Sequence, residues 1–323
     1  MSNKEFPSKK HTQKKGSRSR KVIVLGGSGF VGSQVVPLLI SRGYMPVIID
    51  LNTPKYETSA HAIVADTRNN WNEEISNQDR HTLTHPLAYI NLAGVSIGGK
   101  FTPERKRLIH DSRVETTRRM GEFFEEQMYR PEVLVQASAV GYYGDAHDTI
   151  LNESSKKGKG FLSDVVSAWE QEARHIEKHY GVRTVILRQG HIIGTGGYLA
   201  RLLPIYRKGL GGALGDGQQF LPWIHADDLI EYYLESIQNE RIRGVYNMIS
   251  GEAVRQKYFS QQLARVLKKP HFLRIPVWAM RMMYGELADE MIKSQRINPS
   301  RIDDFEYESV LTSVTEAIEY SIE

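Results

Sequence analysis

The glycine-rich segment GGSGFVG at residues 26–32 restricts the fold of this chain more than any other feature of its sequence. It follows the apolar, β-branched run KVIVL, which is typical of a strand buried on both faces. Residues 30–43 then have the apolar spacing of a helix, with Gly43 as its expected stop. A strand, a glycine turn and a helix in this order begin a βαβ unit, and the N-terminus of such a helix attracts a pyrophosphate.

The alternation of strands and helices continues along most of the chain. We expect further strands at residues 45–50, 62–65, 87–94, 133–138, 183–190 and 244–250, and long helices at about 102–128 and 161–181. This order predicts an α/β fold, a Rossmann-type doubly wound parallel sheet covered on both faces. We assign residues 21–190 plus about 220–250 to this dinucleotide-binding domain. Residues 191–219 plus 251–323 would form a smaller, mostly helical C-terminal substrate region.

Charge and composition exclude several classes of protein. Residues 1–21 carry eight of the 42 Lys and Arg but one of the 38 acids, so the rest of the chain is slightly acidic. Residues 1–20 have almost no apolar side chains and are expected to be a disordered basic tail, which argues against a nucleic-acid partner for the folded part. The chain has no cysteine, and no apolar run long enough to cross a bilayer. We expect a cytoplasmic protein with no membrane partner.

Acidic residues at the ends of two expected strands indicate how a dinucleotide would bind. Asp50 ends the second strand, 24 residues after Gly26, where an acid binds the adenosine ribose hydroxyls and repels a 2′-phosphate. It favours NAD over NADP, although Lys55 would weaken that preference. Asp66 is a candidate for the adenine amino group, with a loop-capping role as the alternative. The expected cofactor-binding residues of NAD(P) are Gly26, Gly27, Ser28, Gly29, Phe30, Val31, Gly32, Asp50, Asp66, Leu92, Ala93 and Gly94.

No metal site is expected. His225, Asp227 and Asp228 lie within four residues and have the chemistry of a ligand set. They fall, however, at the junction of a strand and a helix within residues 220–237, where Asp is a usual N-cap. We therefore expect the helix to be capped near Asp227 or Asp228.

Several longer motifs resemble one family over residues 21–320. They are NLAGVSIGGKFTPERKRLIHDSRVETT, QASAVGYYGD, FLSDVVSAWEQEA, GDGQQFLPWIHADDL and GELADEMIKSQRINPSRI. Together they resemble the atypical short-chain dehydrogenases/reductases of the epimerase-like subgroup, the NAD-dependent epimerase/dehydratase family proteins with a small C-terminal domain of unknown function. The resemblance implies an oxidoreductase or epimerase acting on a small polar substrate, nucleotide sugars included. It also implies a homodimer formed through the helices at 103–128 and 161–179.

The chain departs from this family at the usual catalytic pair. Typical members use a Tyr as general acid/base and a Lys four residues later. Here the pair would fall on Leu162 and Val166, or on Phe161 and Val165 in the neighbouring register. Neither register supplies a proton donor or a cation.

Two hypotheses about the reaction therefore stay open. Tyr142 and Tyr143 follow the fifth strand, and a Tyr there would act as a general acid if a cation such as Lys106 or Arg113 lowered its pKa. The first hypothesis takes Tyr143 as the proton donor, with Ser138 and Arg113 polarising the substrate oxygen. The second is a non-catalytic NAD(P)-binding regulator or assembly factor.

Overall fold

A seven-stranded parallel sheet forms the centre of the computed structural model, which describes residues 19–251 and 253–322. Its strands, in spatial order, are β12 (Gly244–Met248), β7 (Arg183–Gln189), β5 (Val133–Ala139), β4 (Ala88–Asn91), β1 (Lys21–Leu25), β2 (Met45–Asp50) and β3 (His61–Val64). Each overlaps an expected strand, with ends that differ from the expected ones by at most three residues. Most of the tail expected to be disordered, residues 1–18, lies outside the described residues.

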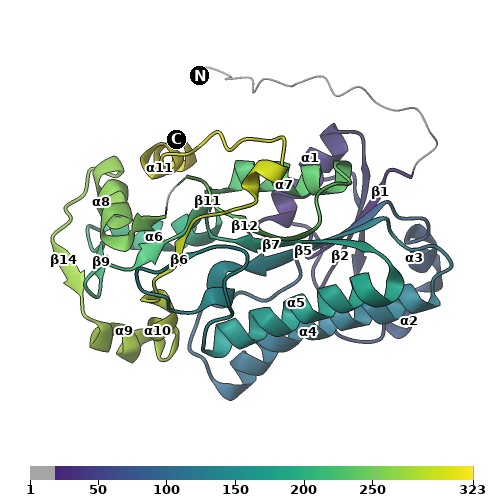
Figure 1. The fold of residues 1–323 in the computed structure, drawn as a ribbon, viewed down its shortest axis with the longest axis horizontal. Coiled ribbons are helices and arrows are strands. Elements are labelled where there is room, and N and C mark those ends of the chain that lie inside the picture. Colours follow the sequence, from purple (N-terminus) through teal and green to yellow (C-terminus); the bar gives the residue numbers. More distant parts are fainter. Residues whose placement is uncertain (1–18, 252, 323) are drawn as a thin grey trace.

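Helices cover both faces of the sheet (Figure 1). One face carries α1 (Gly32–Ser41) and α7 (Ala226–Gln238); the other carries α2 (Trp71–Glu74), α3 (Asn77–Thr82), α4 (Pro103–Glu126) and α5 (Phe161–Tyr180). Successive side chains of a strand point to opposite faces, so β1 contributes to both cores. Val22 and Val24 pack in the cluster of Tyr233, whereas Ile23 and Leu25 pack in the cluster of Phe124. The doubly wound Rossmann fold expected from the sequence is confirmed.

The strand order creates a crevice between β1 and β4. The chain runs outward through β1, β2 and β3, and then returns to β4 on the other side of β1. Ligands of open α/β sheets bind outside the carboxyl ends of the strands at such a switch point. Gly26, directly after β1, has φ +75°, and a Cβ atom there would lie 2.8 Å from the carbonyl carbon of Leu92 after β4. Only glycine lets these two strand ends approach so closely.

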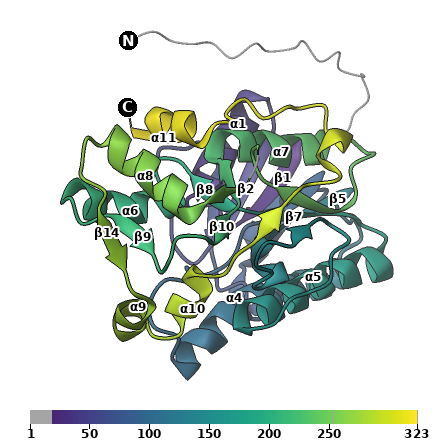
Figure 2. The same ribbon diagram turned by 60° about the vertical axis from the view of Figure 1, so that its left-hand side comes forward.

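The smaller region gathers at one end of the sheet (Figure 2). From residues 191–219 and 251–323 it contains β8 (His191–Ile193), α6 (Gly197–Arg207), β9 (Gly212–Leu214), β13 (Val254–Arg255), α8 (Gln256–Val266), β14 (Leu273–Ile275), α9 (Val277–Tyr284), α10 (Leu287–Met291), β15 (Arg296–Ile297) and α11 (Val314–Ile322). Three short strands from residues assigned above to the dinucleotide-binding domain pair with it: β6 (Ile150–Leu151), β10 (Phe220–Leu221) and β11 (Trp223–His225). The strands pair two by two. Helices α8 and α11 pack over Trp223 and Leu221 in a core of their own. Among the described helices, none is both long and apolar enough to cross a membrane.

The cap of α7 differs from the expectation of Asp227 or Asp228. His225 is the N-cap, and its Nδ1 accepts a hydrogen bond from the Asp227 amide at 3.1 Å. Burial lowers the pKa of His225, which keeps the ring neutral and able to accept. Asp228 is buried instead, where its carboxylate accepts from the Tyr307 hydroxyl at 2.6 Å and the Val310 amide at 2.9 Å. The cap prediction is wrong because the carboxylate of Asp228 accepts its hydrogen bonds from the C-terminal segment, which is distant in sequence.

Candidate cofactor and substrate site

The glycine loop presents free backbone donors at the start of α1. Within the described residues, the amides of Phe30 and Val31 have no protein acceptor. A Cβ atom on Gly32 would lie 2.5 Å from the Cα of Gly27, so glycine is needed for α1 to begin against the loop. Free amides and the positive end of a helix dipole form a site that suits a pyrophosphate.

Asp50 lies beside this loop, as the sequence predicts. Its Oδ2 accepts a hydrogen bond from the Ser28 amide at 3.0 Å, and the Ser28 hydroxyl donates to the Asn52 carbonyl at 2.7 Å. The Tyr56 hydroxyl donates to the Gly27 carbonyl at 2.8 Å. Burial, followed by the charge of Asp50, raises the pKa of Tyr56 to about 12, so this donor stays protonated. The contacts hold a carboxylate next to the phosphate-binding turn.

Asp66 is bound within its own loop at the edge of the sheet. Its Oδ1 accepts from Arg68 through the backbone amide at 3.1 Å and through Nε at 2.8 Å, and its Oδ2 contacts Arg68 Nη2. These hydrogen bonds lower the pKa of Asp66. The contacts match the loop-capping alternative, and its adenine contact stays a prediction.

The loop after β4 is held from beneath by buried amides. Asn91, which is fully buried, accepts from the Ala93 amide at 3.1 Å and donates to Gln136 at 3.0 Å and to Thr117 at 2.9 Å. Leu92, Ala93 and Gly94 therefore lie where the sequence places them, opposite the glycine loop. Of these three residues, Gly94 is exposed, whereas Leu92 and Ala93 are partly buried.

Arg113 supports this loop from α4. Its guanidinium donates to the Ile109 carbonyl at 3.0 Å and to the Val95 carbonyl at 3.1 Å, and lies 5.4 Å from the Trp169 ring centroid. A Cβ atom on Gly94 would lie 3.0 Å from the guanidinium carbon of Arg113. Burial, with a contribution from the charge of Arg105, lowers the pKa of Arg113 to about 10. No carboxylate within the described part of the chain neutralises it.

Two more arginines, not among those the sequence singled out, reach the same loop. Arg105 of α4 donates to the Gly98 carbonyl at 3.1 Å and contacts the Ser96 carbonyl. Arg201 of α6 donates to the Ser96 hydroxyl at 2.7 Å. Neither forms an ion pair among the residues described. Three guanidinium groups thus gather around residues 94–98 without a compensating acid.

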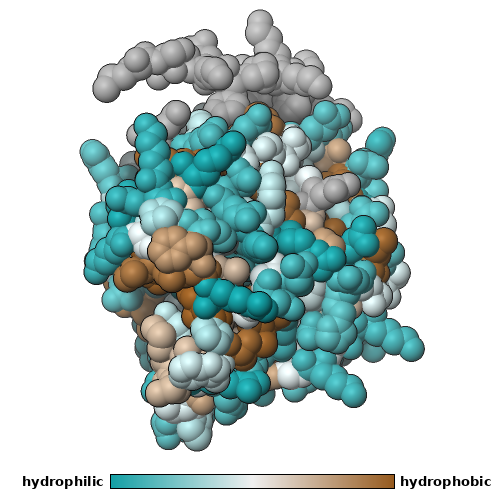
Figure 3. All heavy atoms as spheres, turned by 90° about the vertical axis from the view of Figure 1, so that its left-hand side faces the viewer, coloured by the Kyte–Doolittle hydropathy of each residue, from teal (hydrophilic) through white to brown (hydrophobic). Residues whose placement is uncertain are grey.

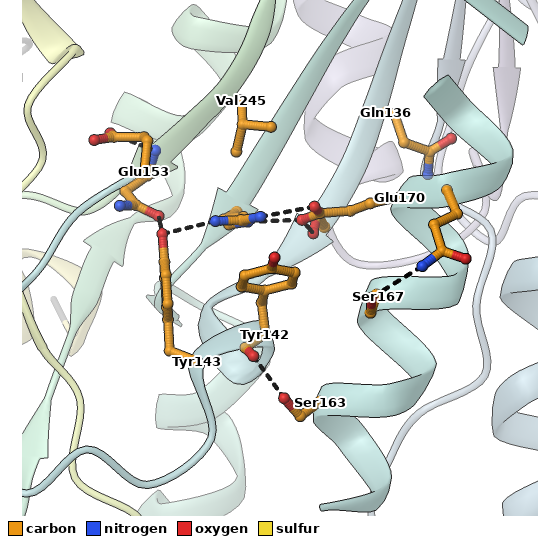
Figure 4. A network of polar contacts seen from close by, with 12 residues as sticks. Gln136, Tyr142, Tyr143, Glu153, Ser163, Ser167, Glu170 and Val245 are labelled. Atoms are coloured by element: carbon orange, nitrogen blue, oxygen red, sulfur yellow. Dashed lines mark hydrogen bonds and ion pairs between the residues drawn. The ribbon is translucent and has the colours of Figure 1, made fainter. Parts of the chain in front are cut away.

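Ser138 and Tyr143, two of the three residues expected to be catalytic, form part of a buried network beneath the site (Figure 4). Glu170 accepts from Ser138 Oγ at 2.7 Å and from Arg188 Nε at 2.7 Å and Nη2 at 2.8 Å. Arg188 Nη1 donates to the Tyr143 hydroxyl at 2.8 Å, and this hydroxyl donates to Asn247 Oδ1 at 2.8 Å. The network joins β5, α5, β7 and β12 at the carboxyl end of the sheet.

Because of this network, Tyr143 and Ser138 have little exposed surface that a substrate could contact. Their relative exposures are 2% and 4%, and both hydroxyls are engaged. Burial also raises the pKa of Tyr143. Tyr142 is half-buried, and its ring centroid lies 3.5 Å from the Arg188 guanidinium carbon. Its hydroxyl has no hydrogen bond within residues 19–251 and 253–322. The catalytic role of Tyr143 and Ser138 stays a prediction, and the geometry favours Tyr142 as a proton donor.

Sequence reasoning missed the ion pair of Arg188 and Glu170, although the sequence held a signal for it. Arg188 lies in the expected sixth strand, and a charged residue at a buried strand end needs a partner. Which partner it takes depends on the packing of α5 against the sheet. The sequence alone could not supply that information.

Phe30 has a second role that its place in the glycine loop does not indicate. Its ring lies against Gly194, Gly196 and Gly197, leaving no room for a Cβ atom at Gly196. The side chain of Phe30 therefore joins the glycine loop to the segment between β8 and α6, while its backbone faces the pyrophosphate site.

Histidine and acidic side chains do not gather as metal ligands anywhere in residues 19–251 and 253–322. His225 and Asp228 serve as a helix cap and as an acceptor for the C-terminal segment.

Comparison with proteins of known sequence gives a consistent family. Residues 22–248 match the model of the NAD dependent epimerase/dehydratase family. The chain is 33% identical to the epimerase family protein YfhF of Bacillus subtilis, over 87% of this chain and 90% of that protein. It is 32% identical to the chloroplastic epimerase family protein SDR39U1 homolog of Arabidopsis thaliana, over 92% of this chain and 85% of that protein.

Solved structures agree with this result. The human epimerase family protein SDR39U1, crystallised with NADPH, superposes with a TM-score of 0.80 at 25% identity, covering 93% of this chain and 98% of that one. The UDP-glucose 4-epimerase of Thermotoga maritima shares the fold, with a TM-score of 0.77 at 17% identity over 94% of this chain and 97% of that one. This chain belongs to the NAD dependent epimerase/dehydratase family, in the epimerase-like group that its motifs resemble.

Proposed function

We propose that this protein binds NAD or NADP at the switch point between β1 and β4 and uses it as an oxidoreductase or epimerase on a small polar substrate. The observation that carries the proposal is the pair of free amides at Phe30 and Val31, beside the Asp50 carboxylate held on Ser28. The human relative bound to NADPH and a Thermus thermophilus UDP-glucose 4-epimerase bound to NAD support it. The cofactor would supply the hydride chemistry, and the protein would orient the substrate.

We expect NAD to be preferred over NADP. The charge of Asp50 beside the glycine turn would repel a 2′-phosphate, whereas its oxygens would accept from free ribose hydroxyls. Asp50→Arg should weaken NADH binding about 30-fold through lost charged hydrogen bonds and strengthen NADPH binding. Titration by the fluorescence of the bound dinucleotide measures both, with the exposed Asp303→Arg in the 3-10 helix Ile302–Asp304 as the matched control.

Two outcomes of this titration would count against the proposal. Equal NADH affinity in Asp50→Arg and wild type would remove the assigned role of Asp50. If the wild-type protein binds neither nucleotide below the millimolar range, the proposal of an NAD(P) cofactor is contradicted. The glycine loop would then be a feature of the fold alone.

The three arginines around residues 94–98 favour a substrate with an anionic group. Arg113 and Arg105 come from α4, and Arg201 comes from the 191–219 segment that we assign to the substrate region. A phosphate or carboxylate would supply the compensating charge that the described residues lack. Nucleotide sugars and small phosphorylated or carboxylated carbonyl compounds are therefore the first substrates to screen.

The proton donor is tested by a pair of neighbouring tyrosines. Because Tyr142 has a free hydroxyl and its ring packs on the Arg188 guanidinium, Tyr142→Phe should lower turnover about 100-fold and leave NADH affinity unchanged. Tyr143→Phe should keep most of the turnover, since its hydroxyl is occupied by Arg188 and Asn247. Steady-state rates with an active substrate decide between them. The opposite ranking, with both variants folded, would establish the assignment of Tyr143 made from the sequence.

A second candidate function is a cofactor-binding regulator without turnover. It is favoured by the apolar residues at both registers of the usual Tyr-Lys pair, Phe161, Leu162, Val165 and Val166, of which the two valines are buried. Tight NADH binding with no oxidation of NADH by any compound of the substrate screen would support this alternative. Turnover with a single compound would exclude it.

A further inference from the structure

Large apolar side chains are exposed together on one face of the smaller region. Leu210, Phe272, Trp278, Met282 and Met283 have relative exposures of 56%, 77%, 66%, 72% and 61%. We call these five residues the apolar corner. The pairing of β9 with β14 places Leu273 opposite Gly212, which brings the preceding Phe272 close to the loop that carries Leu210. Figure 3 shows apolar side chains gathered on this face, with hydrophilic ones around them.

The segments that form this face are strongly basic. Residues 197–215 and 253–285 contain ten Lys and Arg and no Asp or Glu, whereas the chain from residue 22 onward has 34 bases and 37 acids. Exposed bases without an ion pair in the described chain lie next to the apolar corner; they are Arg207, Lys208, Lys268 and Lys269. Arg281 is neutralised by Asp289 of α10. Unpaired positive charge therefore lies beside the part of the apolar corner formed by Leu210 and Phe272.

We propose that the apolar corner docks this protein on an anionic lipid bilayer. Phe272, Trp278 and Met282 would enter the boundary between headgroups and acyl chains, where aromatic side chains are favoured. Lys268 and Lys269 would lie at the phosphate level, where each base near an anionic surface contributes about 1 kcal/mol. A second copy of the chain fits this face less well, because its own positive charges would meet.

The sequence predicts no membrane partner because it contains no long apolar run, and the apolar corner we propose as a docking face would not produce such a run. Its apolar side chains come from short elements separated by polar residues, and folding brings them together. The inference rests on exposed side chains far from the glycine loop and does not depend on the proposed cofactor chemistry.

The test uses the full chain and the fluorescence of Trp278, the one exposed tryptophan of the four. Trp71, Trp169 and Trp223 are at most 5% exposed, whereas Trp278 is 66% exposed. Vesicles of equal parts phosphatidylcholine and phosphatidylglycerol should sediment the protein and shift its tryptophan emission to shorter wavelength. Vesicles of phosphatidylcholine alone should do neither, and added salt should weaken the binding. Trp278→Phe should still sediment but lose the emission shift.

Two variants and their controls separate this face from non-specific charge. Lys268→Glu/Lys269→Glu should lower vesicle partitioning about 30-fold or more, whereas Lys178→Glu/Arg241→Glu makes the same charge change elsewhere and should keep the Trp278 shift. Phe272→Ser/Met282→Ser should also reduce partitioning, with Met128→Ser as the exposed control. All these side chains are exposed, so the fold should be unaffected, as circular dichroism would check.

Three results would overturn the proposal. One is no sedimentation with anionic vesicles. A second is sedimentation that the 268/269 and 272/282 variants do not reduce, which would place binding in the basic segment before residue 21. The third is an emission shift of Trp278 that depends on protein concentration without vesicles, which would make the apolar corner a contact between copies of the chain.

Discussion

Replacing Arg188 with methionine is expected to lower the free energy of unfolding by about 4 kcal/mol. The guanidinium of Arg188 is 1% exposed and makes two hydrogen bonds to Glu170, which is fully buried. Without it, the Glu170 carboxylate would stay in a low-dielectric interior with its charge poorly compensated, and Tyr143 would lose a donor. Urea unfolding followed by circular dichroism measures the change.

The same carboxylate provides a matched control. Arg174 also donates to Glu170, at 3.0 Å, but its side chain is 46% exposed. Arg174→Met should therefore cost less than about 1 kcal/mol, as exposed ion pairs do. Adding Glu170→Gln to Arg188→Met should recover at least about 1 kcal/mol, because it removes the unpaired charge. Equal costs for Arg188→Met and Arg174→Met would show that burial does not set the strength of this ion pair.

Gly26→Ala is expected to cost about 3 kcal/mol. A positive φ costs an L-residue about 1–2 kcal/mol, and a Cβ atom 2.8 Å from the Leu92 carbonyl carbon adds a further overpacking cost of about 1–3 kcal/mol. The clash is with backbone, so the two strand ends must move apart. NADH binding should weaken at least about tenfold with the distorted turn, since positioning of the amides supplies the affinity.

Gly181 is the control for the conformational part of this cost. It ends α5 with φ +69°, close to the +75° of Gly26, and nothing lies within 4 Å of where its Cβ atom would be. Gly181→Ala should cost only about 1 kcal/mol and leave NADH binding intact. If both alanine variants lose the same stability, the close approach of β1 and β4 at Gly26 imposes no cost of its own.

Beneath the candidate site lies the buried ion pair of Arg188 and Glu170, and not a Tyr-Lys pair of the kind that the resemblance implies for typical members. Ser138, Glu170, Arg188, Tyr143 and Asn247 satisfy one another and fix the carboxyl ends of β5, β7 and β12. We therefore expect a substrate of this protein to meet groups outside the network, such as the half-buried Tyr142 and the arginines around residues 94–98. Substrate screening with anionic carbonyl compounds addresses this surface directly.

The fold was readable from sequence to the extent that local patterns define it. Buried parallel strands are short apolar runs, and each expected run of the central sheet is a strand. The glycine spacing likewise predicted the turn between β1 and α1, because Gly26 and Gly32 are needed for contacts within one βαβ unit. Asp50 was also identified, since its place at the end of a strand determines where its carboxylate lies.

Other features depend on residues that meet only after folding. Asp228 accepts from Tyr307 and Val310, 79 and 82 residues away, so the helix-cap rule could not describe it. Tyr143 is occupied by Arg188 and Asn247 from two other strands, and no spacing within QASAVGYYGD indicates this.

The βαβ unit, the doubly wound parallel sheet and the glycine turn could be predicted from the sequence, because they follow from periodicity and from steric limits on neighbouring residues. Which polar groups remain free was set by the tertiary structure. It engaged Ser138 and Tyr143 in the network, gathered Arg105, Arg113 and Arg201 at one loop, and joined Phe272 to Trp278 in one exposed face. The physical reason is that hydrogen bonds and burial are satisfied by whichever groups packing brings into contact, irrespective of their separation along the chain.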